Sequence, residues 1–106
     1  MKSTMKYLYG KTIHVIGFAG TEGAALLQYL SRSFPRAAIT GHDYSEKKVF
    51  LKHFLESHSA FPKKEARLKA EEILGFTNVE YQFRENYLKG IENADTLFVP
   101  QSWFLY

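Results

Sequence analysis

The chain has 106 residues, of which 45% are hydrophobic and 16% aromatic, which is enough for one compact domain and too little for two. Its formal net charge of +3 falls well short of a nucleic-acid-binding footprint, so no nucleic-acid partner is expected. The absence of cysteine excludes disulfides and thiolate metal sites and is compatible with a reducing compartment, so a cytoplasmic location is expected.

The first predicted strand covers residues 11–16, and the first predicted helix covers residues 22–33. The strand segment is almost continuously apolar at its end, as in strands that are buried on both faces. In the helix, Leu26, Leu27 and Leu30 recur at helical spacing. Glycines and Glu22 interrupt the apolar stretch between them, so neither a signal peptide nor a membrane contact is expected.

The remaining predicted elements alternate strands with helical segments. They are a strand at 37–40, a helix capped by Ser45 that buries Phe50 and Phe54, a helix at 62–74 that ends at Gly75, a strand at 78–83, a short helix or turn at 85–92, and a strand at 96–99. This order predicts an α/β, Rossmann-like fold with a mainly parallel sheet of four to five strands and helices on both faces. Residues 1–106 are expected to form a single domain.

Three glycines at a spacing of three follow the first strand, at Gly17, Gly20 and Gly23. Such a turn allows a tight reversal and a close approach of the backbone to an anion, and the helix that follows presents free amides. Asp43 follows the second strand, where a carboxylate can accept hydrogen bonds from a ribose or a base. These features predict a diphosphate site, with residues 100–102 converging on the same crevice. In a purely structural interpretation, Gly20 and Gly23 serve packing and Asp43 caps a turn before Ser45.

Other residues give weaker indications. His14 lies within the first strand and is expected to be a core or strand-edge polar residue. His53 and His58 are five residues apart, on different helical faces, so no metal site is expected. The sequence also lacks a nucleophile elbow, an ATP-binding P-loop and a supported pair of carboxylates, so no catalytic residue is assigned.

The segment IHVIGFAGTEGAALLQYL, residues 13–30, followed by ITGHDYS, residues 39–45, resembles the N-terminal domain of the Mur ligases. The resemblance is strongest to the branch that joins an amino acid or peptide to UDP-N-acetylmuramate, which typically reads IHxxGxxG and then TGxD or SGSD. The segment NYLKGIENADTLFVPQSW, residues 86–103, is similar to the fourth-strand region of that family, with its serine displaced to Ser102.

The resemblance implies a UDP-binding recognition domain of an enzyme of peptidoglycan precursor synthesis. In this family the glycine turn holds the diphosphate and the second-strand acid lies near the uridine. The implied UDP-binding residues are Gly17, Phe18, Ala19, Gly20, Thr21, Glu22, Gly23, Asp43 and Ser102. ATP and Mg²⁺ would bind the central and C-terminal ligase domains, which these 106 residues do not include and which are the expected protein partners. No cofactor is expected in this domain.

Two alternatives remain open. The GxxGxxG spacing also occurs in the NAD(P)-binding domain of extended short-chain dehydrogenases, in which Asp43 would take the adenosine ribose. A non-catalytic module with the same fold is the other alternative, to which Glu22 and the aromatic segment 103–106 would point.

Overall fold

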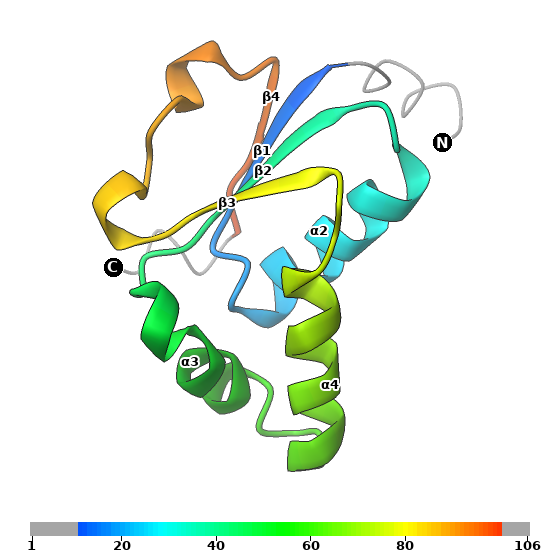
Figure 1. Ribbon diagram of the computed structural model, residues 1–106, viewed down its shortest axis with the longest axis vertical. Coiled ribbons are helices and arrows are strands. Elements are labelled where there is room, and N and C mark those ends of the chain that lie inside the picture. Colours follow the sequence, from blue (N-terminus) through cyan, green and yellow to red (C-terminus); the bar gives the residue numbers. More distant parts are fainter. Residues whose placement is uncertain (1–10, 101–106) are drawn as a thin grey trace.

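The computed structural model describes residues 11–100, which form a four-stranded sheet with α-helices packed against one face (Figure 1). The strands are β1 (Thr12–Ile16), β2 (Ala38–His42), β3 (Val79–Gln82) and β4 (Thr96–Phe98), and the α-helices are α2 (Thr21–Ser33), α3 (Phe50–Ser57) and α4 (Lys63–Leu74). All strand pairs are parallel and the order is β3-β2-β1-β4. The predicted Rossmann-like α/β fold is confirmed. Among the described helices, none is long and apolar enough to cross a membrane.

The connection from β3 to β4 differs from the other two connections. It contains two short 3₁₀ helices, η3 (Arg84–Asn86) and η4 (Ile91–Asn93), and no α-helix. We refer to residues 83–95 as the crossover. Figure 1 shows it on the opposite side of the sheet from α2, α3 and α4. One face of the sheet is therefore covered by α-helices and the other by 3₁₀ turns.

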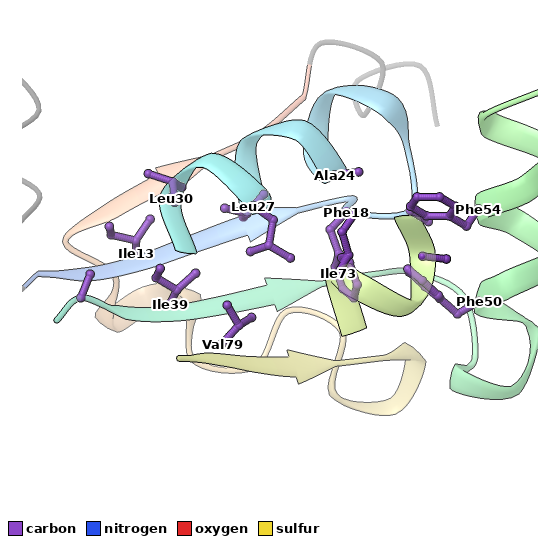
Figure 2. Packing of buried hydrophobic residues seen from close by; sticks show 14 of the residues in the cluster. Ile13, Phe18, Ala24, Leu27, Leu30, Ile39, Phe50, Phe54, Ile73 and Val79 are labelled. Carbon is purple, nitrogen blue, oxygen red and sulfur yellow. The ribbon is translucent and has the colours of Figure 1, made fainter. Parts of the chain in front are cut away.

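The hydrophobic core lies between the sheet and the three α-helices (Figure 2). Ile13, Ile39 and Val79 project from three adjacent strands towards the buried side of α2. Phe18, in the turn after β1, has no exposed surface, and its ring lies 4.9 Å from that of Phe50. The turn after β1 is thus anchored to α3 by an aromatic contact, which holds the backbone of the candidate site against the core.

Two predictions about local structure differ from what the structure shows. The strand predicted at 37–40 extends to His42, because its parallel pairing continues to Ile16 on one side and Gln82 on the other. The predicted cap at Ser45 is wrong, since α3 begins at Phe50, after the 3₁₀ helix η2 (Lys47–Val49), and has no side-chain cap. The hydroxyl of Ser45 instead donates to Asp43.

Candidate functional site

The chain reverses direction directly after β1, at Gly17. This glycine has a φ of 78°, in the left-handed region that favours glycine. Its N–H donates to the carbonyl oxygen of His42 at 2.6 Å, and its own carbonyl accepts from the N–H of Gly20 at 3.2 Å. These bonds link the turn to the end of β2 and fix its backbone.

Helix α2 begins directly after the turn. Gly20 is its N-cap and makes no side-chain cap hydrogen bond, and the first helical bond runs from the N–H of Ala24 to the carbonyl of Gly20. The N–H groups of a first helical turn have no acceptor within the helix, and the dipole places partial positive charge there. This end of α2 therefore has the properties of an anion-binding site.

The glycines at the start of α2 serve different purposes. A Cβ atom on Gly23 would lie 2.2 Å from the carbonyl oxygen of Gly17, a severe clash with backbone. A Cβ on Gly20 would lie 3.6 Å from the same oxygen, which is ordinary contact. Close packing of α2 on the turn after β1 thus requires glycine at Gly23, as the purely structural interpretation proposes, whereas packing alone does not require it at Gly20.

A groove of about 270 Å³ opens beside the turn, between the first half of α2 and the ends of β1 and β4. It is lined by Val15, Ile16, Glu22, Gly23, Leu26, Phe98, Val99 and Pro100. In the order β3-β2-β1-β4, the chain connections reverse direction between β1 and β4, so the groove lies at the topological switch point of the sheet. Of the segments predicted to converge on one crevice, Gly23 and Pro100 line the groove, Asp43 does not, and residues 101–102 lie outside the described part of the chain. The contributions of Leu26 and Phe98 were not predicted, because both residues follow the ordinary pattern of core residues.

Asp43 lies beneath the turn and does not line the groove. Its carboxylate is 5% exposed; Oδ1 accepts from the backbone N–H of Ala19 at 3.1 Å, and Oδ2 accepts from the N–H of Ser45 at 3.0 Å and from its hydroxyl. The side chain therefore joins the glycine turn to the loop after β2. This matches the turn-capping alternative and adds Ala19, a partner that lies too far away in sequence to be recognised from a local pattern.

The remaining predicted site residues differ in their exposure. Phe18 and Ala19 are buried, so a ligand would meet them only through their backbone. Thr21 and Glu22 are exposed, and Glu22 lines the groove. Ser102 and the aromatic segment 103–106 lie outside the described residues.

The sheet face beneath the crossover carries a pair of histidines. His14 and His42 are both buried, and Nδ1 of His14 lies 2.6 Å from Nε2 of His42. Burial lowers the pKa of each imidazole below its usual 6.5, although Glu92 and Glu80 oppose this shift at His14. The expectation of a strand-embedded polar residue at His14 is confirmed. Between residues 11 and 100, no three histidine, aspartate or glutamate side chains are grouped so that they could hold a metal ion.

Comparison of the chain with known protein families, with curated proteins and with solved structures found no match.

Proposed function

We propose that this domain binds the diphosphate of a nucleotide, specifically of a UDP-sugar of the UDP-N-acetylmuramate type, as the N-terminal domain of a Mur-type, ATP-dependent amide ligase does. The observation that carries the proposal is the position of the groove. It lies at the topological switch point, directly beside the glycine turn, and Glu22, Gly23 and Leu26 of the first half of α2 form one of its walls. Nucleotides bind at this place in doubly wound sheets, with the diphosphate at the helix N-terminus.

The size and lining of the groove suit part of such a ligand. Its volume of about 270 Å³ is slightly below the roughly 300–1,000 Å³ of sites that enclose a whole drug-sized molecule. A diphosphate at the turn would leave the apolar wall, formed by Leu26, Phe98 and Pro100, to contact the attached sugar. The choice of a UDP-sugar over other nucleotides derives from the sequence resemblance at residues 13–30 and 39–45.

Asp43 has a defined part in this proposal. Because both of its oxygens already bond to the chain, its first role is to hold the backbone of Ala19, and with it the turn, in a fixed conformation. A preformed turn loses less conformational entropy when it binds an anion. A hydrogen bond donated by the uridine to Asp43 would use the remaining lone pairs of the carboxylate.

The test is a calorimetric titration of the chain with UDP, UDP-N-acetylmuramate, NAD and NADP. We expect saturable binding of the two uridine nucleotides and weaker binding of NAD and NADP. Preference for NAD or NADP would instead support the dehydrogenase-type alternative, and no binding of any of the four would support a non-catalytic module.

Two alanine substitutions locate the site. Gly20→Ala places a methyl group where a diphosphate would approach, yet meets no close atom of the chain, so the fold should persist and UDP affinity should fall. Gly75→Ala is the matched control, because Gly75 ends α4 at the opposite, amino edge of the sheet. Equal UDP affinity in the two variants would contradict a diphosphate site at the turn.

A further inference from the structure

The two buried histidines connect the sheet to the crossover. Nδ1 of His14 is 2.6 Å from Nε2 of His42, and the two rings are stacked with their centroids 4.9 Å apart. The other nitrogen of His42, Nδ1, is hydrogen-bonded to the backbone carbonyl oxygen of Tyr87 in the crossover. One chain of hydrogen bonds therefore runs from β1 through β2 to the segment that covers this face.

The direction of this chain is fixed by its last acceptor. A carbonyl oxygen can only accept, so Nδ1 of His42 carries a hydrogen, and in the neutral ring Nε2 of His42 is then an acceptor. Nδ1 of His14 must therefore donate to it. In the neutral pair, both His14 and His42 are Nδ1–H tautomers.

Two nitrogens of the neutral pair carry no hydrogen, Nε2 of His14 and Nε2 of His42, and protonation has a different effect at each. A proton on Nε2 of His14 leaves the chain of hydrogen bonds intact. A proton on Nε2 of His42 removes the acceptor for His14 and turns two N–H groups towards each other across 2.6 Å. The pair can therefore hold one added proton without rupture, but not two.

The groups around the pair affect the protonation of His14 and His42 differently. Burial opposes a positive charge on both rings. At His14, Glu92 in η4 and Glu80 in β3 favour the charge, whereas at His42 the carbonyl of Tyr87 favours it and His14 opposes it. From β4, the residue in register with His14 is the apolar Leu97, and α2, α3 and α4 lie on the opposite face of the sheet. The two glutamates thus support the first proton, and no further carboxylate raises the pKa of His42 to support the second.

We propose that the His14–His42 pair is a pH-sensitive clasp, which releases the crossover from the sheet when the pair takes up a second proton. A second attachment of the crossover does not titrate: the side-chain amide of Gln82 lies against the carbonyl oxygens of Asn86 and Lys89, and with its nitrogen turned towards them it donates to both at 2.8 Å. His42 keeps its Nδ1–H bond to Tyr87 when its Nε2 takes up a proton, so acidification acts through the repulsion and hydration of two positive charges beneath the crossover, and the contacts of Gln82 keep the opening local to this face. The inference does not depend on nucleotide binding.

The first test is made on the unaltered chain. Long-range ¹H–¹⁵N NMR spectra of the imidazoles at about pH 8 report which nitrogen of each neutral ring carries the hydrogen. We expect Nδ1–H for both His14 and His42. An Nε2–H form at either residue would show that the hydrogen-bond chain runs differently, and this result would overturn the proposal.

The second test follows amide hydrogen exchange between about pH 8 and about pH 5, corrected for the intrinsic exchange rate. Each proton taken up on opening lowers the protection of the crossover by up to about tenfold per pH unit. We expect this loss at residues 83–95 at a pH where α4 keeps its protection. Loss of protection at the same rate in α4 would mean general acid unfolding and would overturn the proposal.

Three variants distinguish a pH-dependent release of the crossover from a pH-independent loss of its attachment to the sheet. His14→Gln should remove most of the pH dependence, because the pair can no longer accumulate two protons. Gln82→Ala should lower the protection of the crossover by a similar factor at every pH, because the lost amide does not titrate. His53→Gln, at an exposed position of α3, should change nothing. If His14→Gln kept the pH dependence of the parent chain, the clasp would be excluded. If that variant fails to fold, the tautomer measurement on the unaltered chain still tests the proposal.

Discussion

The carboxylate of Asp43 holds the backbone of Ala19, with Oδ1 accepting from its N–H at 3.1 Å. The two residues are 24 positions apart, at the ends of adjacent parallel strands. The bond is buried, and the other carboxylate oxygen accepts from Ser45. The glycine turn is therefore held in place by the side chain that the sequence pattern assigns to the ligand, so the stability of the turn and the proposed binding involve the same residue.

Substitution of Asp43 should reduce both properties. Asp43→Ala leaves the buried N–H groups of Ala19 and Ser45 without acceptors, which should lower the free energy of unfolding by about 2 to 4 kcal/mol. UDP binding, measured where the variant is still folded, should weaken by about 1 to 3 kcal/mol. Urea unfolding and calorimetry measure the two effects. Asp43→Asn is the companion variant: it keeps one carbonyl oxygen, so its loss of stability should be smaller. An unchanged urea midpoint in Asp43→Ala would rule out the proposed structural role.

A methyl group should destabilise the fold far more at Gly23 than at Gly20. In Gly23→Ala the new Cβ would lie 2.2 Å from the carbonyl oxygen of Gly17, so α2 and the turn after β1 must separate. Such overpacking typically costs about 1 to 3 kcal/mol, and the backbone contact favours the upper end. Gly20→Ala, with 3.6 Å to the same oxygen, is the matched control and should change stability little. Similar thermal unfolding curves for the two variants would contradict this assignment.

The features that could be predicted from sequence depend on short-range patterns. The glycine spacing after an apolar run predicts the turn, and the apolar period of residues 22–33 predicts α2, because both are decided within a few residues. The length of β2 and the bond from Ala19 to Asp43 could not be predicted, since they depend on pairing between distant segments, such as Ile16 with His42. The His14–His42 contact could not be predicted for the same reason. It requires β1 and β2 to be parallel and in a particular register, which no local pattern specifies.

The histidine pair should also give the whole fold a pH dependence. Burial lowers the pKa of both His14 and His42 in the folded chain, so the unfolded chain, with pKa values near 6.5, binds protons first as the pH falls. The free energy of unfolding should therefore be highest above about pH 6.5 and decrease below it, by up to about 1.4 kcal/mol per pH unit for each histidine. Urea unfolding at several pH values measures this slope. His53→Gln should keep the slope and His14→Gln should reduce it; the same slope in both variants would assign the effect to other groups.

Glu22 places a carboxylate on the wall of the groove, close to the proposed diphosphate. Like charges at an exposed site repel weakly, because water and salt screen them. Glu22→Gln should therefore raise UDP affinity by roughly threefold to fivefold at low salt, and less at high salt. Glu71→Gln, at an exposed position on α4, is the charge-matched control and should have little effect. A loss of affinity in Glu22→Gln would indicate that Glu22 accepts a hydrogen bond from the ligand.

Gly20→Asp gives the sharpest separation of folding from binding. Gly20 is the N-cap of α2 and has an extended backbone, with φ −80° and ψ 167°, and no side chain caps the helix. Aspartate is among the preferred residues at an N-cap, so the variant should unfold at slightly higher urea, with a gain of a few tenths of a kcal/mol. The same carboxylate would occupy the anion position at the helix end and repel a diphosphate, so UDP binding should be lost. Gly20→Ala distinguishes steric from charge effects, since it adds bulk without charge. A Gly20→Asp variant that is more stable and still binds UDP as tightly as the parent chain would place the diphosphate elsewhere.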